Sequence, residues 1–209
     1  MKLLFIILTV LQSLLATLEQ KTLQSDFTLT IANNPSPIAN SQLPITNRPK
    51  NWCSDSLLKS DLPLSFPPTY IENISERISL YRELDSLGDE AALLAYQKRL
   101  IDRFGKLPEE AEQLLNVVRL RWLCCRMGIE KVILKQERIS LYFITHNPKF
   151  FQSDIFEKIL RYACSRVDRC RLVEDKDRQG KPTGKRYVTI QQVKTISGAL
   201  HLLNKILEG

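Results

Sequence analysis

The chain has 209 residues and a formal net charge of +7, from 30 Lys and Arg against 23 Asp and Glu. Its 44% apolar and 25% charged residues are ordinary for a globular protein, which excludes fibrous and wholly disordered classes and allows one domain with a sizeable core. The positive charge permits contact with nucleic acid or an acidic protein surface but requires neither. The five cysteines form no CxxC pair, so neither a zinc knuckle nor a complete disulfide framework is encoded.

Residues 1–48 are expected to be a disordered extension of the domain. Lys2 precedes an apolar run typical of a secretory leader, but the cleavage site near Ala16 is poor and the run is too short for a stable membrane span. Residues 33–50 are rich in Pro, Asn and Ser, which predicts a linker. Residues 1–32 also resemble, faintly, the leader of a periplasmic lipoprotein carrier.

The segment from Trp52 to Thr69 contains three prolines, which predicts extended chain lying over the domain. Helices are expected next. Ser75 is a candidate N-cap, and Gly88 ends the first helix. The face that this helix is expected to bury consists of Ile78, Tyr81 and Leu84.

A second helix is predicted over about residues 89–104, with Gly105 as its C-terminal cap. Its inward stripe is expected to contain Leu93, Leu94, Leu100, Ile101 and Phe104. A third helix is predicted to begin at Pro108 and to end at Gly128. The residues expected on its buried side are Leu114, Leu115, Val118, Trp122 and Met127.

After Gly128 the hydrophobic period changes from 3.6 to 2, which predicts β-structure. Ile129–Lys135 and Ile139–Ile144 flank three polar residues and predict a hairpin. A second strand pair is expected at Cys170–Glu174 and Arg186–Gln191, joined by a loop over residues 175–185. Further helices are expected from Pro148, with Phe151, Ile155, Phe156, Ile159, Leu160 and Ala163 inward, and from about Thr195, with Ile196, Leu200, Leu203 and Leu207 inward.

This order of elements predicts an α+β fold, with N-terminal helices followed by a small antiparallel sheet interleaved with helices. The domain is expected to span residues 49–209.

No catalytic, cofactor or metal site is predicted. Gly180–Lys185 only mimics a phosphate-binding loop, because no strand-loop-helix context surrounds it. His146 and His201 are the only histidines, and neither has supporting ligands or a triad at a useful spacing. Cys124 and Cys125 are neighbours on a predicted helix and point about 100° apart, so they do not form a metal pair. The chain is therefore expected not to be an enzyme.

Two motifs within residues 70–108 carry a family resemblance. The first runs from Tyr70 to Arg82 and reads YIENISERISLYR, and the second is LIDRFG at Leu100–Gly105, followed by Leu107 and Pro108. Together they closely resemble the opening of the C-terminal domain, or TRCF domain, of the bacterial transcription-repair coupling factor. The resemblance covers about residues 52–209. Glu72 departs from the proline that is usual in this family.

The resemblance implies a non-catalytic regulatory domain of transcription-coupled nucleotide excision repair in the cytoplasm. In this family the domain holds the parent protein's own UvrA-binding module, restrains the DNA translocase motor, and is released when the motor engages a stalled RNA polymerase. UvrA, RNA polymerase and DNA are then indirect partners. The motor motifs are absent from this chain, so an ATPase activity does not carry over to it.

The resemblance also points to the end of the second helix as the protein-interaction surface. The residues implied are Arg99, Asp102, Arg103 and Lys106. Asp102 matches an acidic position of the family, whereas Arg99 stands where some relatives carry an acid. From the residues alone, the alternative is that these charges cap and solvate a helix end.

Two further hypotheses stay open. One is a stand-alone nucleic-acid-binding module, with DNA bound directly, although no aromatic-basic interleaving of an RNA-recognition type supports it. Its candidate cations are Arg119, Arg121, Arg126, Lys131, Arg166, Arg169, Arg171, Lys181, Lys185 and Arg186. The other is a secreted protein led by residues 1–16, a fragment, or a misassembled fusion of two reading frames. The sequence leaves the oligomeric state open.

Overall fold

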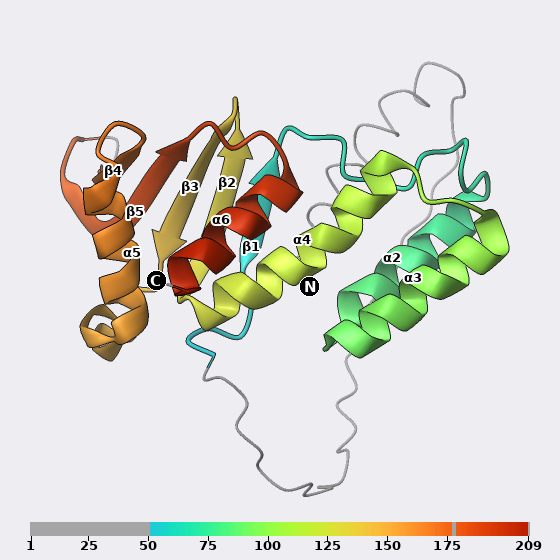
Figure 1. Ribbon diagram of the computed structural model, residues 1–209, viewed down its shortest axis with the longest axis horizontal. Coiled ribbons are helices and arrows are strands. Elements are labelled where there is room, and N and C mark those ends of the chain that lie inside the picture. The colour runs from blue at the N-terminus through green and yellow to red at the C-terminus, as the bar shows by residue number, and fades with distance from the viewer. Residues whose placement is uncertain (1–50, 177–178, 209) are drawn as a thin grey trace, which may run out of the picture.

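A computed structural model describes residues 51–176 and 179–208 of the chain (Figure 1). The expected extension over residues 1–48, with its leader-like run and its linker, lies outside the described residues. The described elements in chain order are β1 (Leu57–Ser60), α2 (Ile74–Ser86), α3 (Glu90–Phe104), α4 (Glu109–Arg126), β2 (Ile129–Lys135), β3 (Arg138–Phe143), the 3-10 helix η1 (Pro148–Gln152), α5 (Asp154–Ser165), β4 (Cys170–Lys176), β5 (Pro182–Gln191) and α6 (Ile196–Glu208).

The strands form one five-stranded sheet in the order β1-β2-β3-β5-β4. The predicted α+β fold class is confirmed. The sheet is mixed rather than purely antiparallel, because β1 lies parallel to β2 while the other neighbours are antiparallel. Strand β1 lies within the segment that the sequence assigned to extended covering chain. With four residues followed by a proline-rich stretch, it is too short to show a period of its own.

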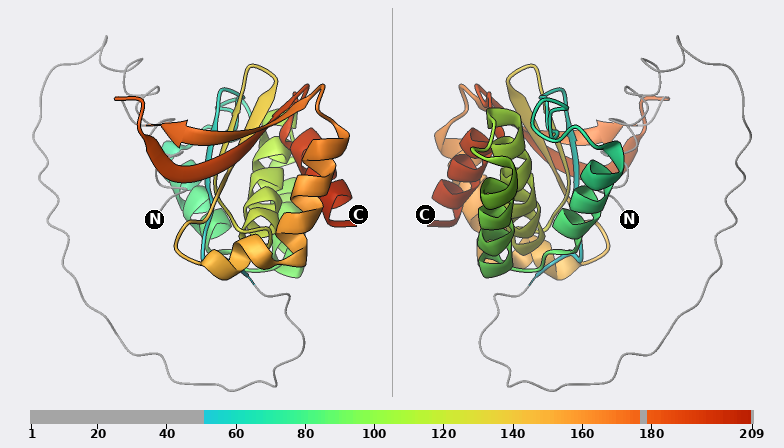
Figure 2. Two further views of the ribbon diagram at one scale, coloured as in Figure 1. Left: turned by 90° about the vertical axis from the view of Figure 1, so that its left-hand side faces the viewer. Right: turned by 90° about the vertical axis from the view of Figure 1, so that its right-hand side faces the viewer.

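Helices α4, α5 and α6 lie on one face of the sheet (Figure 2). The sheet residues that face them, such as Val132, Leu141 and Val188, are at most 1% exposed. Helices α2 and α3 lie side by side beyond the β1 edge and pack on α4 (Figure 1). The core therefore forms between the sheet and α4–α6 and extends under the α2–α3 pair.

Side-chain caps set the starts of α2 and α3. Asn73 is the N-cap of α2, and its side-chain oxygen accepts a hydrogen bond from the Glu76 N–H at 3.1 Å. The prediction of Ser75 as the cap is wrong, since Ser75 already lies inside the first turn. Asp89 caps α3 by accepting from the Ala92 N–H at 2.8 Å. Gly105 closes α3 with a positive φ of 84°, as the sequence predicted.

The buried side of α3 differs from the predicted stripe. Leu93, Tyr96 and Leu100 are at most 1% exposed, whereas Leu94 and Ile101 are 52% and 42% exposed. These three buried residues, spaced three and four apart, already fill one helical face, so the neighbouring leucine and isoleucine point away from it. The expectation that Leu94 and Ile101 face inward is wrong.

The helix expected from Pro148 is split into η1 and α5. Ser153 ends η1 and caps α5, because its hydroxyl accepts a hydrogen bond from the Phe156 N–H at 3.3 Å. The split turns Phe150 rather than Phe151 fully into the core. The second hairpin also differs from its prediction, because β4 and β5 continue into the segment that was expected to be a loop.

Arg121 on α4 joins three segments of the chain. Its guanidinium donates to Asp55, just before β1, at 2.9 Å and to Asp85, at the end of α2, at 2.8 Å. These carboxylates, by hydrogen bonds and by charge, outweigh the effect of burial and raise the pKa of Arg121. The Trp52 N–H adds a backbone bond of 2.9 Å to the Cys125 carbonyl near the end of the same helix. The described N-terminal segment is thus fixed to the domain from Trp52 onward.

Candidate functional site

The two family-like motifs meet where α3 ends. The Tyr70 hydroxyl donates to the backbone carbonyls of Leu100 and Gly105 at 3.2 and 3.0 Å. The Tyr70 ring lies 5.8 Å from the half-buried Phe104 ring, measured between centroids. A tyrosine of the first motif therefore fixes the backbone of the second, and the end of α3 is held in one geometry.

The remaining aromatic residues of this region hold α2 in place. The Phe66 N–H donates to the Tyr81 hydroxyl at 2.8 Å, and the Tyr96 hydroxyl donates to the Leu80 carbonyl at 2.9 Å. Burial raises the pKa of both tyrosines, which keeps both hydroxyls protonated. Arg77 is buried and donates to the Ile71 carbonyl. Much of the first motif is thus explained by the packing of the α2–α3 pair.

The four residues implied as the interaction surface all lie at the C-terminal end of α3, but in two different states. Arg99 and Arg103 form ion pairs with Glu83 and Glu76 of α2. Arg103 also lies over the Phe104 ring, 5.1 Å from its centroid. The two arginines therefore join α3 to α2. Their side chains are 61% and 67% exposed, so these pairs add little to stability.

Asp102 and Lys106 are exposed, and neither forms an ion pair with any of the residues that the structure describes. Asp102 lies between Arg99 and Arg103 in the sequence, and both arginines pair with acids of α2. Among the four implied residues, Asp102 therefore supplies the free negative charge and Lys106 the free positive charge.

Asp102 belongs to a continuous exposed stripe along α3, which we call the α3 outer face. Its members, spaced three and four residues apart, are Ala91, Leu94, Ala95, Lys98, Ile101 and Asp102. Leu94 and Ile101 are two of five large apolar residues exposed in the described part of the chain. The α3 outer face thus combines two exposed apolar side chains with charges toward its C-terminal end.

Sequence reasoning missed the apolar part of this surface because α3 has too many apolar residues for one face. Leu93 and Leu94 are adjacent, as are Leu100 and Ile101, so each pair must place one member outside. Tyr96 was the missing signal, because counting it with Leu93 and Leu100 identifies the inner face and leaves Leu94 and Ile101 on the outer one.

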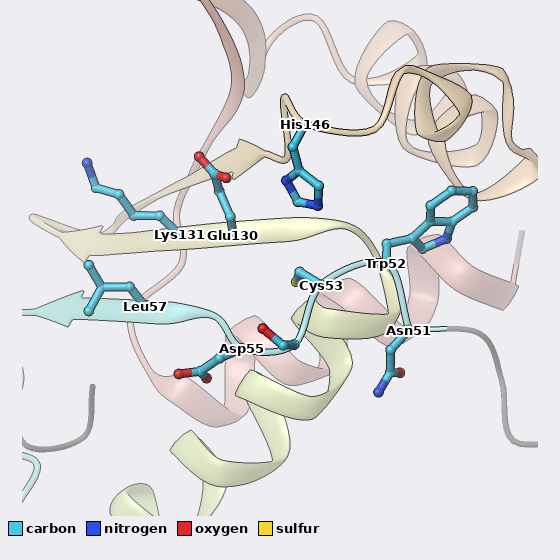
Figure 3. Close-up of a pocket in the computed structure, with 9 residues that line it drawn as sticks. Asn51, Trp52, Cys53, Asp55, Leu57, Glu130, Lys131 and His146 are labelled. Carbon is cyan, nitrogen blue, oxygen red and sulfur yellow. The ribbon is translucent and has the colours of Figure 1, made fainter. Parts of the chain in front are cut away.

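A pocket of about 770 Å³ lies beside the start of β2 (Figure 3). Glu130 and His146 line it from one side, and Cys53 and Asp55 line it from the other (Figure 3). A hydrogen bond to Cys125 and burial raise the pKa of the Cys53 thiol, so it is not an activated nucleophile. Within residues 51–176 and 179–208, no three His, Cys, Asp or Glu side chains gather as metal ligands.

The cations proposed for a nucleic-acid-binding module are divided among more than one surface. Arg119 pairs with Glu90 of α3, and Arg121 is the partly buried link between Asp55 and Asp85 described above. Lys131 lies on the sheet, over the Tyr142 ring. Arg119 and Arg121 of α4 are therefore occupied by acidic partners.

No helix in the described part of the chain is long and apolar enough to cross a membrane.

Comparisons with known proteins agree with the resemblance. Residues 60–153 match the family model of the TRCF domain. The transcription-repair-coupling factor of Rickettsia prowazekii (strain Madrid E) is 29% identical over 101 residues, which make up 48% of this chain and 8% of that protein. The same factor of Escherichia coli (strain K12) is 37% identical over 71 residues, 34% of this chain and 6% of that protein. The chain thus matches a small part of the length of these relatives.

The fold is also similar to a solved one, described as the crystal structure of the C-terminal domain of transcription-repair coupling factor. The two share a TM-score of 0.54 and 17% sequence identity, over 75% of this chain and 95% of the other. This structural likeness shows the fold, and the similarity in sequence rests on the family model and the curated relatives. Residues 60–153 of the chain are therefore similar to the TRCF domain of transcription-repair coupling factors.

Proposed function

We propose that this chain is a non-catalytic protein-interaction domain of transcription-coupled DNA repair. Its α3 outer face binds the UvrA-binding module of a transcription-repair coupling factor, within the parent protein or in trans. Through that contact it restrains the DNA translocase motor. UvrA, RNA polymerase and DNA are reached only through the parent protein.

One observation carries the proposal: the α3 outer face combines exposed apolar side chains with a free carboxylate. Leu94 and Ile101 lie on the same side of α3 as Asp102 and are covered by no other described element. Apolar contact supplies non-directional affinity, and a charge at the margin supplies orientation and partner choice. The family match assigns this helix to the TRCF domain, since α3 lies inside residues 60–153.

Asp102 is proposed to meet a local cation of the partner, beside the exposed Lys98 and Lys106, which have no ion pair among the described residues. Arg99 departs from the acid carried by some relatives, which by itself would reverse the polarity of this helix end. Glu83 and Glu76 of α2 offset the charges of Arg99 and Arg103, so the arginines do not oppose a cationic partner at full strength. Asp102 is left as the free acid of the stripe.

A contact of this kind suits a clamp that must open. Leu94 and Ile101 form a small apolar patch, and an exposed ion pair is worth about 1 kcal/mol or less, so affinity is moderate and release by a competing contact is possible. A regulatory clamp is a two-state element that differential binding shifts. An active site is not required for it.

The test is to titrate the full chain with the purified UvrA-binding module of a relative and to measure affinity by calorimetry. Asp102→Lys is expected to weaken binding by roughly 1–2 kcal/mol, because an attraction is lost and a repulsion is added. Leu94→Ser is expected to weaken it by a similar amount through lost apolar burial. The matched control is Glu157→Lys, the charge reversal of an exposed acid on α5, which should bind like the parent chain.

Folding separates this role from a structural one. Asp102→Lys should leave the melting temperature unchanged, since its side chain has no partner among the described residues. Phe104→Ala should lower stability, but by less than the roughly 3–5 kcal/mol of a fully buried phenylalanine, because its ring is half-buried against Tyr70. Normal binding by Asp102→Lys and Leu94→Ser together would remove the α3 outer face from the contact.

A further inference from the structure

The sheet has a second face that no described helix covers, and we call it the open sheet face. It lies opposite α4, α5 and α6 (Figure 2). Cross-strand pairing sets its rows, since Lys131 pairs with Tyr142 and Tyr142 pairs with Tyr187. In a neighbouring row Ile133, Ser140, Thr189 and Arg171 pair in the same way. Because side chains alternate along a strand, all of these residues share the face opposite the buried core.

A stacked aromatic pair occupies the middle of this face. The rings of Tyr142 and Tyr187 lie 4.4 Å apart between centroids and are inclined by 22°. The Lys131 ammonium lies 4.4 Å from the Tyr142 ring centroid. Both tyrosines are half-exposed rather than core residues. The face therefore offers aromatic surface with a cation directly beside it.

Cations, Lys131 included, occupy outward positions on four strands of this face. They are Lys59 on β1, Lys131 and Lys135 on β2, Arg138 on β3 and Arg171 on β4. None of these five side chains forms an ion pair with another of the described residues. Burial raises the pKa of Tyr142, and the negative charge of Asp175, near the end of β4, adds to this shift. The five cations of this face are thus not paired with acids among the described residues, unlike Arg119 and Arg121 on α4.

We propose that the open sheet face binds single-stranded nucleic acid. A base stacks on the face of the Tyr187 ring that is turned away from Tyr142, and backbone phosphates contact the cations of the neighbouring strands. Stacking on aromatic side chains together with a basic track is how sheet surfaces hold single strands without strong sequence preference. An acidic protein would use the cations but would gain little from the tyrosine pair. This surface is separate from the α3 outer face, so the inference does not rest on the proposed clamp.

The test uses the full chain and labelled short single strands of oligo-dT and oligo-rU, with fluorescence anisotropy at two salt concentrations. Tyr187→Leu is expected to weaken binding roughly tenfold, because each base stacked on an aromatic side chain contributes on that scale. Lys131→Gln should weaken binding and reduce the slope of log affinity against log salt by about 0.7, the value for one phosphate contact on a single strand. The dT and rU arms distinguish a DNA ligand from an RNA one.

Matched controls lie on the helix side of the molecule. Tyr162→Leu removes a half-buried tyrosine of α5, and Lys205→Gln removes an exposed cation of α6. Both should bind like the parent chain, and thermal melting checks that each variant is folded. Absence of saturable binding at low salt would overturn the proposal. So would equal affinity for Tyr187→Leu and the parent chain, which would leave only a general attraction for polyanions, or tighter binding of duplex DNA than of single strands.

Discussion

At the scale of residues, the family-like motifs contain two kinds of position. Tyr70, Arg77 and Tyr81 have their polar atoms committed to backbone groups, so their role is to fix the α2–α3 pair. Asp102 and Leu94 lack such contacts and remain available to a partner. Family resemblance alone cannot separate these roles, because packing residues and contact residues lie side by side in one motif.

The five cysteines are expected to differ sharply in reactivity. Cys164 is exposed, whereas Cys124 and Cys125 are buried, and burial raises the pKa of Cys124 and Cys170. The thiolate is the reactive form, so a raised pKa slows alkylation at pH 8 even where the sulfur is partly accessible, as at Cys53. Brief iodoacetamide treatment of the native chain, read by peptide mass spectrometry, should label Cys164 first. Equally fast labelling of Cys53 would contradict the described environment of that thiol.

At the scale of elements, local signals predicted the helices well and the first strand badly. Gly105 and Gly128 mark helix ends through positive φ values of 84° and 67°, a preference that short sequence patterns carry. The hairpin of β2 and β3 was predicted because its period of two spans many residues. Strand β1 was missed because four residues show no period, and its pairing with β2 depends on segments more than 70 positions apart.

Both proposed surfaces could be predicted only in part from the sequence, because each depends on how distant or competing residues pack. Asp102 was identified through the resemblance, but Leu94 was assigned to the core because neighbouring apolar residues compete for one helix face. Tyr142 and Tyr187 come from strands that are 45 positions apart along the chain, and only sheet register stacks them. Such a pair produces no alternation of aromatic and basic residues along the sequence, so the sequence alone does not predict it.

The two helix-ending glycines give a matched test of packing. A Cβ at Gly128 would lie 2.3 Å from a ring carbon of Phe150, whereas nothing lies within 4 Å of one at Gly105. Both positions have positive φ, so alanine strains the backbone at each. Gly105→Ala is expected to cost about 1 kcal/mol and Gly128→Ala clearly more, because Phe150 must also move. Urea denaturation measures both, and equal losses would contradict the close Phe150 contact.

At the scale of the whole molecule, the domain is expected to begin near Pro49. The N–H of Trp52 and the carboxylate of Asp55 bind α4, which fixes the chain from this point. A chain of residues 49–209 should therefore unfold in one cooperative transition by circular dichroism. A chain of residues 62–209 lacks β1 and the Asp55 partner of Arg121, so it should be markedly less stable. Similar melting of the two chains would show that β1 is dispensable and the proposed boundary is wrong.

The two proposed surfaces let one small domain make two unlike contacts. The α3 outer face lies beyond the β1 edge of the sheet, while the tyrosine pair lies on β3 and β5 (Figure 1). Each surface can therefore be altered without changing the other. A variant defective in protein contact should keep its nucleic-acid affinity, and the converse should also hold.

The most direct test of the proposed contact is methyl NMR of the full chain during titration with the UvrA-binding module of a relative. Exposed apolar residues serve as probes both on and away from the surface, because Leu94 and Ile101 lie on the α3 outer face while Val167 and Leu172 lie elsewhere. We expect saturable shifts of the Leu94 and Ile101 methyl signals, with Val167 and Leu172 unchanged. Saturable shifts confined to Val167 and Leu172, or no shift at Leu94 and Ile101 under saturating module, would contradict the proposed contact.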